Sequence, residues 1–304
     1  MDDPFGELDA LLEVGLGADG YAAIAHAEAA LVARTGRTDL AAAFAGRQVV
    51  ARFFIAGFGT PLQRAAWLRR TAAVAISEPG VGAHPKHLST RAEPSGEGWR
   101  LSGEKAWASN GPFADVFIVL AIMAIEDGRK RYGAFLVPRD TPGLTIHPTE
   151  TRHCGLSLRD CEVPRAALLG VPGTAYETMA LPFRDVEDAV GLSALGGALR
   201  FLVGRLGGEA HALGGLIALT AVLEAGADRI AAALDAGELA EHAAEAIGLR
   251  LLAVEIGERV RRHRAEFGPS DDPAAERILA DLEIGQTVAR GPRAARQARL
   301  APVG

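Results

Sequence analysis

Apolar residues recur at three- and four-residue spacing near the start of the chain, which is the pattern of amphipathic helices. Leu8–Val14, Ile24–Val32 and Leu40–Phe54 each carry such a face. Thr60 precedes Pro61, an arrangement typical of a helix N-cap followed by proline at the first helical position. Residues 1–70 are therefore expected to form a short helical domain.

The pattern changes after residue 70, where short apolar runs alternate with clusters of Gly, Pro, Ser and Asp. Such runs are typical of strands. Glu126–Arg129 lies between two of them and contains Asp-Gly, which favours a hairpin. Residues 71–172 are expected to form a β domain with strands at Val74–Ile76, Trp99–Leu101, Val116–Ile125, Tyr132–Val137, Leu144–His147 and Cys161–Val163.

Helical spacing returns between residue 173 and the end of the chain. Four long apolar-faced segments separated by glycine-containing breaks predict an antiparallel four-helix bundle. They are Met179–Leu206, Ala210–Ala236, Ala240–Phe267 and Pro273–Leu300. The expected fold class is α+β, with a helical segment (1–70), a central β domain (71–172) and a C-terminal bundle (173–304).

Composition narrows the class of protein. The 304 residues carry a net charge of −6, with arginines scattered along the chain, which argues against nucleic-acid binding. Two cysteines, Cys154 and Cys161, are too few for a disulfide framework or a zinc site, so we expect free buried thiols. The first residues are acidic and the uncharged apolar runs are shorter than a membrane span. We expect a soluble, cytoplasmic protein without a bound metal.

Four local segments are similar to motifs of the acyl-CoA dehydrogenase family. Phe58–Leu68 resembles its GT-x-x-Q segment, and Ser77–Gly82 (SEPGVG) resembles its [ST]-E-P-x-x-G-S-D loop. Leu101–Gly111 resembles L-x-G-x-K-x-W-[IV]-[ST]-N, and Cys161–Gly170 resembles the V-P-x-x-x-x-L-G exit from the β domain. The resemblance implies a helical segment, a β-barrel-like middle domain and a bundle, with FAD between the last two.

The resemblance also implies roles for individual residues, because family members pass a hydride from an acyl thioester to the flavin. Trp107 would lie against the flavin and Ser109 would bind near its reactive edge. Ile76 and Ser77 would offer backbone and hydroxyl groups to the pyrimidine side of the ring. The alternatives are a core tryptophan at 107 and a plain turn at 77.

The ligand-binding motifs are incomplete in this sequence. Where the family has Ser-Asp, this chain has Ala83 and His84, so position 83 offers only a backbone N–H; His84 is either a new ligand-facing group or a solvated side chain. The resemblance places Arg205 as a phosphate contact of FAD across a dimer interface, although the Phe-Gly that follows in the family is missing.

The usual catalytic glutamate is missing as well. The resemblance places it at Ala289 or Arg290, neither of which accepts a proton at neutral pH. Some members carry the base on the first long bundle helix, where the corresponding position is Val186, one residue from Glu187. Glu187, or alternatively Asp185, is the candidate base. The competing interpretation is that these acids only complement the dipole at the N-terminus of the helix.

Three functions follow as hypotheses. In the first, the chain is an acyl-CoA dehydrogenase-like flavoprotein with FAD and a relocated base. In the second, it is a non-catalytic family member, either a subunit of a heteromer or a protein without flavin. In the third, it is an enzyme that performs different acyl chemistry on the same fold. The N-terminal helical segment (1–70) is shorter than that of the family, which leaves one face of the bundle uncovered. We therefore expect at least a dimer, either of identical chains or with a related subunit. The expected ligand is acyl-CoA or another acyl thioester.

Overall fold

The computed structural model describes residues 20–267, 272–287 and 290–301. The chain divides into two compact units, one built on Gly46–Val186 and one on the flanking segments Ala18–Ala45 and Glu187–Gly304. The expected helix at Leu8–Val14 lies outside the described residues. Helices, then strands, then helices follow one another along the described chain, which confirms the predicted α+β class.

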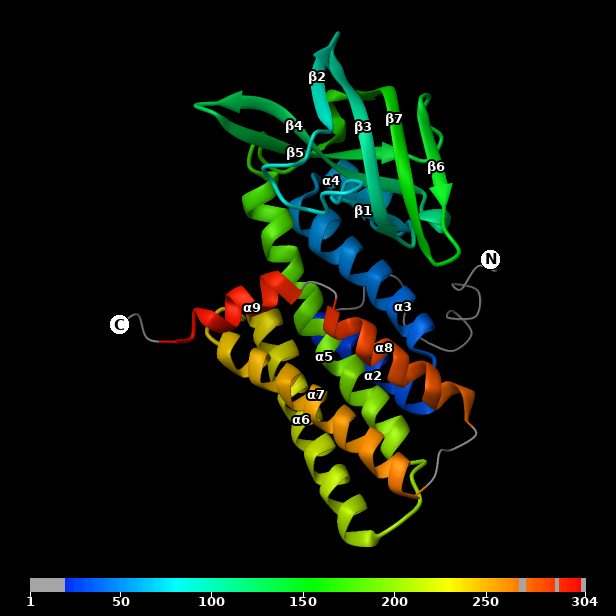
Figure 1. Cartoon of the computed structure of the whole chain (residues 1–304). Coiled ribbons are helices and arrows are strands. Elements are labelled where there is room, and N and C mark those ends of the chain that lie inside the picture. The colour runs from blue at the N-terminus through cyan, green and yellow to red at the C-terminus, as the bar shows by residue number, and fades with distance from the viewer. Residues whose placement is uncertain (1–19, 268–271, 288–289, 302–304) are drawn as a thin grey trace. The chain divides into compact units, whose positions relative to one another are not determined.

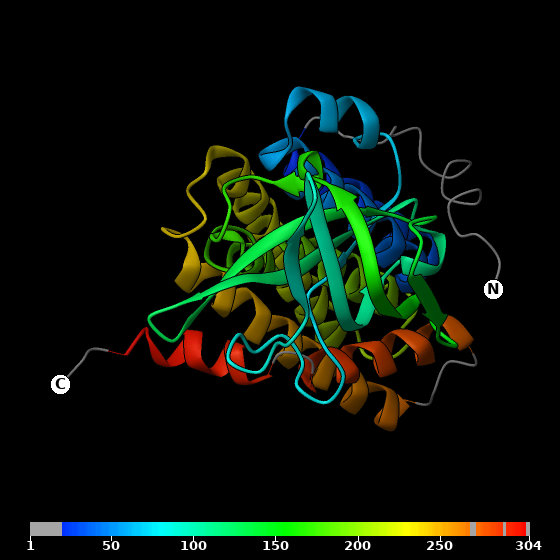
Figure 2. The ribbon, with the colours of Figure 1, turned by 90° about the horizontal axis from the view of Figure 1, so that it is seen from above.

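Unit 1 is built on one open sheet, within which eight strands occur among the described residues. The order is β6-β7-β3-β2-β4-β5-β8, and β1 pairs in parallel with β4. Figure 1 labels most of these strands, and Figure 2 shows how strongly the sheet twists. The strands are β1 (Ala72–Ala75), β2 (Arg91–Ser95), β3 (Gly98–Ser109), β4 (Val116–Glu126), β5 (Arg129–Pro138), β6 (Leu144–Pro148), β7 (His153–Pro164) and β8 (Leu168–Leu169).

The central hairpin of β4 and β5 supplies much of the core of unit 1. Seven consecutive residues from Val116 to Ile122 are buried, as expected for a strand covered on both faces. Asp127 and Gly128 turn the chain with φ of 49° and 73°, the left-handed geometry of a type I′ turn. The hairpin predicted at Glu126–Arg129 is confirmed by the pairing of these two residues.

Five short helices accompany the sheet of unit 1 along the described chain. α4 (Pro61–Trp67) begins at Thr60, whose hydroxyl accepts from the Gln63 N–H while the Gln63 side chain accepts from the Thr60 N–H, so the predicted N-cap is confirmed. The Gln63 amide also donates to the carbonyl oxygens of Ala166 (2.7 Å) and Leu168 (3.0 Å). This links the first motif segment to the exit of the β domain. The remaining short helices are η1 (Ala51–Ala56), η2 (Gly111–Phe113), η3 (Arg165–Ala167) and η4 (Tyr176–Ala180).

Unit 2 is helical. Its helices are α2 (Tyr21–Thr35), α6 (Ala210–Ala236), α7 (Ala243–Phe267), α8 (Pro273–Thr287) and α9 (Arg290–Ala298), together with parts of α3 (Thr38–Val50) and α5 (Leu181–Val203), which also contribute residues to unit 1. The segment expected as one helix from Pro273 to Leu300 therefore contains α8 and α9.

The packing of unit 2 centres on α6, which contacts α2 and α7 (Figure 1). The Asp235 carboxylate near the end of α6 accepts from the N–H groups of Tyr21 (2.7 Å) and Ala22 (2.9 Å), which caps α2. By length and composition α6 could also cross a bilayer, but a core helix passes the same test, so this one helix is weak evidence for a membrane span.

Candidate functional site

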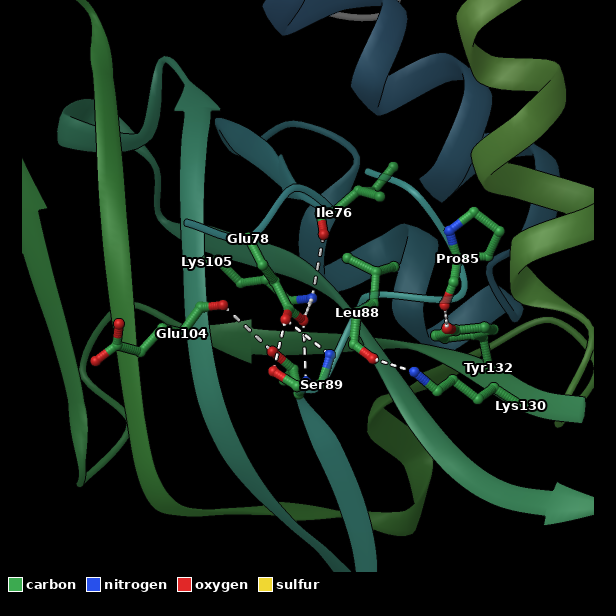
Figure 3. A network of polar contacts seen from close by, with 10 residues as sticks. Ile76, Glu78, Pro85, Leu88, Ser89, Glu104, Lys105, Lys130 and Tyr132 are labelled. Atoms are coloured by element: carbon green, nitrogen blue, oxygen red, sulfur yellow. Dashed lines mark hydrogen bonds and ion pairs between the residues drawn. The ribbon is translucent and has the colours of Figure 1, made fainter. Parts of the chain in front are cut away.

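The motif loop that follows β1 is fixed to the sheet by a buried ion pair (Figure 3). The Lys105 ammonium lies 2.9 Å from Oε1 of Glu78, and both residues are almost fully buried. The Glu78 carboxylate also accepts from the N–H and hydroxyl of Ser89 (both 2.7 Å) and from the N–H of Thr90 (2.9 Å). A buried carboxylate with this many donors has its charge satisfied in place.

Burial, the opposite charge of the partner and hydrogen bonds together set the pKa values of Glu78 and Lys105. Burial by itself would raise the pKa of Glu78, but the charge of Lys105 and the hydrogen bonds from Thr90 and Lys105 bring that pKa well below its usual range. Burial lowers the pKa of Lys105, and the neighbouring carboxylate partly offsets this effect. The pair therefore stays ionised at neutral pH and holds the loop against β3.

The same contacts orient the backbone of the loop. Lys105 donates to the carbonyl of Ile76 (3.2 Å), and the N–H of Ala106 donates to the carbonyl of Ser77 (2.8 Å). The peptide bonds are trans, so the N–H of Ser77 points away from the Ile76 carbonyl and its lysine. Within the described residues, neither this N–H nor the Ser77 hydroxyl makes a hydrogen bond.

The far end of the loop is tied to β5. The Lys130 ammonium donates to the carbonyls of Lys86 and Leu88 (2.7 Å each), and the Tyr132 hydroxyl donates to that of Pro85 (2.5 Å). Figure 3 shows these side chains reaching the loop from the neighbouring strand. The loop is therefore held at both ends, which gives a fixed surface to anything that binds there.

Between these ends lies the stretch where the sequence departs from the family motif. The Ala83 carbonyl accepts from the guanidinium of Arg184 (3.3 Å) and from the Tyr176 hydroxyl (3.4 Å). His84 is exposed, and its ring lies 4.8 Å from that of His87 between centroids. Position 83 retains its N–H, and the His84 carbonyl accepts from the N–H groups of His87 (2.9 Å) and Leu88 (3.2 Å), while its side chain is exposed.

Trp107 stands out on β3. A β-bulge between Lys105 and Ala108 places it in the left-handed region with φ of 61°, an unusual conformation for a bulky residue. Its side chain is 66% exposed, which excludes the core-tryptophan alternative. Ser109, two residues further, is also exposed. An exposed indole on a strained backbone is typical of a ligand-contacting position.

The hairpin end beside Trp107 contains a histidine that the sequence motifs do not single out. The ring of His153 meets the Trp107 ring edge to face, with centroids 6.1 Å apart. The adjacent Arg152 donates to the side-chain oxygen of Asn110 (2.9 Å), and Asn110 is buried. Position 153 is found only through the pairing of β3 with β7, which places Ser109 opposite His153.

Arg205, the residue assigned to a phosphate of FAD, makes contacts within unit 2. Its guanidinium lies 3.1 Å from the carboxylate of Asp272 and 3.4 Å from the centroid of the Phe201 ring. The assignment to FAD stays a prediction. It requires the guanidinium to bind an anion in addition to Asp272.

The candidate bases lie on α5. Asp185 and Glu187 are both exposed, and the assignment of either as the base stays a prediction. Asp188 is different, because its carboxylate pairs with three guanidinium groups, which with hydrogen bonds hold its pKa below the usual range despite burial. These belong to Arg250, Arg293 and Arg296. A carboxylate neutralised in this way is a poor base.

The usual base position stays without a structural description. Ala289 lies outside the described residues, and Arg290 opens α9 with its side chain outside them. Both cysteines are free and buried, as expected. Within the part of the chain that the structure describes, no group of three or more His, Cys, Asp or Glu side chains could hold a metal ion.

Comparison with known proteins shows that the middle of the chain is similar to acyl-CoA dehydrogenases. A family model described as acyl-CoA dehydrogenase, middle domain, matches residues 73–163. The chain is 33% identical over 135 residues to cyclohexane-1-carbonyl-CoA dehydrogenase of Syntrophus aciditrophicus, which covers 42% of this chain and 35% of that protein. The chain thus spans about a third of the length of this curated relative.

Two solved structures extend the similarity to most of the chain. Glutaryl-CoA dehydrogenase from Mycobacterium smegmatis superposes with a TM-score of 0.74 at 25% identity, covering 93% of this chain and 81% of that one. A structure described as the FAD complex of PigA gives a TM-score of 0.74 at 19% identity, covering 92% and 82%. The second match shows a shared fold only.

Proposed function

We propose that this chain, which belongs to the acyl-CoA dehydrogenase family, is a flavoprotein that binds FAD and oxidises an acyl thioester. The observation that carries the proposal is the conformation of Trp107, a large aromatic side chain that a strained bulge holds out from the sheet. Such exposure has a free-energy cost that a covering ligand would offset. FAD is a ligand of the related fold in the PigA complex.

The residues of unit 1 fit a planar ring with polar edges. Trp107 offers an aromatic face, and Ser77 offers an N–H and a hydroxyl that bond nothing else within the described residues. Ser109 is exposed on the same strand as Trp107. The ion pair of Glu78 and Lys105 keeps the Ser77 peptide in its orientation, so these groups are arranged before a ligand arrives.

In the proposed reaction, FAD supplies the hydride acceptor. The chain's own contribution would be to bind the thioester beside the ring and to remove its α proton. We propose Glu187 as the base, with Asp185 as the alternative, because both side chains are exposed on α5 and neither position 289 nor 290 carries an acid. A base of this kind must come within hydrogen-bond reach of the α carbon.

A second function is favoured by the same missing acid at positions 289 and 290. The chain would then be a non-catalytic subunit that joins a related partner, or a family member that acts without flavin. Under either function we propose an assembly of at least two chains, in which Arg205 would contact FAD across the interface. The partner would be a second copy or a related subunit.

The absorption spectrum of the purified protein tests the flavin proposal. A bound flavin gives a band near ~450 nm, and we expect it in the wild type and its loss in Trp107→Ala. Because the Trp107 side chain is 66% exposed, its removal should leave the urea unfolding midpoint nearly unchanged. Trp67→Ala, a half-buried tryptophan on α4, is the matched control and should retain flavin. Protein that stays colourless after addition of FAD would overturn the proposal.

The turnover proposal needs a separate experiment. Under anaerobic conditions, bleaching of the flavin band by butyryl-CoA reports hydride transfer, and we expect Glu187→Gln to slow it by at least ~100-fold. Bleaching at the wild-type rate in Glu187→Gln but not in Asp185→Asn would move the role to Asp185. Flavin that is bound but never bleached by short, medium or long acyl-CoA would favour the non-catalytic alternative.

A further inference from the structure

A network of three side chains favours one tautomer of the neutral His153 ring. The carbonyl of His153 can only accept, so its 3.0 Å contact with the Thr149 hydroxyl is favourable when that hydroxyl donates its single proton there. The Thr149 and Thr151 hydroxyls are 2.9 Å apart, and in this arrangement Thr151 is the donor between them. Thr151 then has no proton left for the Nδ1 of His153, also 2.9 Å away. Nδ1 therefore carries the hydrogen and donates to Thr151.

The consequence concerns the other ring nitrogen. A neutral imidazole with hydrogen on Nδ1 has a bare lone pair on Nε2. Burial and the charge of Arg152 lower the pKa of His153, which favours this neutral form. Within the described residues Nε2 makes no hydrogen bond. The ring thus ends in an acceptor without a donor.

The surroundings of this acceptor place it next to the aromatic surface of β3. The ring of His153 touches that of Trp107 edge to face, at an angle of 74° between the planes. The bulge at Trp107 lies opposite Gly155 of β7, because the pairing jumps from Lys105–Leu156 to Ala108–Cys154. Gly155 has no side chain, so position 155 places no side-chain atoms opposite the bulge.

We propose that His153 is a ligand-binding residue of the Trp107 surface, whose Nε2 accepts a hydrogen bond from an N–H or O–H group of the planar ligand. This inference rests on the proposed function, in which the ligand is FAD. Oxidised FAD has suitable donors in the imide N–H of its ring and in the hydroxyls of its ribityl chain. No motif of the sequence marks position 153, which the fold brings to Trp107 through the pairing of β3 and β7.

Binding constants of three variants test the assignment. His153→Phe keeps an aromatic ring but removes the acceptor, and we expect the dissociation constant for FAD, measured by fluorescence titration of the apoprotein, to rise roughly 5- to 10-fold. His153→Gln offers an amide oxygen and should restore binding to within about 3-fold. His147→Phe is the matched control, because its Nε2 already bonds the Ser157 hydroxyl at 2.8 Å.

A second ligand locates the donor. Lumiflavin has the imide N–H but no ribityl chain, so weaker binding of both ligands by His153→Phe assigns the bond to the ring. Weaker binding of FAD alone assigns it to a ribityl hydroxyl. Equal binding of both ligands by wild type and His153→Phe overturns the inference and leaves the proposed function intact. A wild type that binds neither ligand overturns both.

Discussion

Glu28 is a buried carboxyl group that has no charge partner among the residues described by the structure. It lies on α2, is 4% exposed, and its Oε2 has no hydrogen-bond partner among the described residues. Burial raises its pKa from 4.5 to about 8. At neutral pH the folded protein therefore holds a proton that the unfolded chain releases. The stability of unit 2 depends on pH through this residue.

The sign of this dependence gives a prediction for Glu28→Gln. Because the folded pKa exceeds the unfolded value, the contribution of Glu28 to stability is complete below about pH 4.5 and is lost as pH rises toward about 8. We expect the wild-type free energy of unfolding to fall by roughly 3 kcal/mol through this group between about pH 5 and 7.5. Glu28→Gln should remove that slope, as measured by urea unfolding at three pH values.

The control for Glu28 is Glu266→Gln, which changes an exposed glutamate on α7. Its unfolding curves should follow the wild type at each pH, since an exposed carboxyl has nearly the same surroundings in both states. If Glu28→Gln shows the same slope as this control, the carboxyl is ionised in the folded protein and finds a partner or water there.

Individual site residues could be predicted from sequence only where a motif fixes the backbone. The motif around Trp107 predicts a ligand-facing tryptophan; the structure shows an exposed side chain on a strained backbone, and the ligand contact itself stays a prediction. The buried pair of Glu78 and Lys105 was not predicted, because 26 residues separate the two charges and only the pairing of the strands joins them. The contact of His153 with Trp107 was missed for the same reason.

Helix α9 is held by charge at its junction with α5 and α7. Asp188 of α5 pairs with Arg293 (2.9 Å) and Arg296 of α9, and its backbone carbonyl accepts from Arg250 of α7 (3.0 Å). The Asp188 side chain is 23% exposed. In this partly buried setting, three guanidinium groups pair with the same carboxylate, so loss of its charge would remove an ion-pair partner from each of them.

Asp188→Asn tests this account of α9. The amide keeps the shape of the side chain but removes the charge, so we expect Arg290–Ala298 to open more often. Hydrogen exchange followed by mass spectrometry should show exchange in this helix accelerated by roughly 5-fold or more, with α6 unchanged. Asp228→Asn, which removes an exposed partner of His26, is the control and should leave α9 as it is. Equal protection of α9 in both variants would show that apolar packing holds it.

The elements with strong periodicity were predicted well, and those without it were not. Helix α6 has the predicted bounds, and β4 and β5 extend only slightly beyond the apolar runs. Strand β2 was missed because its sequence, RAEPS, is polar and contains Pro94. The structure explains how proline is tolerated there: β2 pairs with β4 only at Arg91, so the Pro94 nitrogen faces no partner on that side.

At the scale of the whole molecule, α6 carries an apolar surface that its own unit does not cover. One side of the helix packs on α2 and α7, whereas Ile217 and Val222 on the other are 59% and 57% exposed. Small residues, Gly214, Ala218 and Ala221, surround them and are exposed as well. An exposed apolar patch on a long helix is typical of an interface. It agrees with the proposal of an assembly of at least two chains.

The oligomeric state therefore gives a prediction about this surface. We expect the wild type to have at least twice the mass of one chain in light scattering coupled to size exclusion, and the double variant Ile217→Lys, Val222→Lys to have the mass of a monomer. Two ammonium groups would have to leave water in the interface, at a cost of several kcal/mol. Leu251→Lys changes a residue of α7 that is 50% exposed and should keep the wild-type mass. A wild type that is monomeric alone, and doubles in mass only with a related subunit, would support the heteromer. A double variant that keeps the wild-type mass would place the interface elsewhere on the chain.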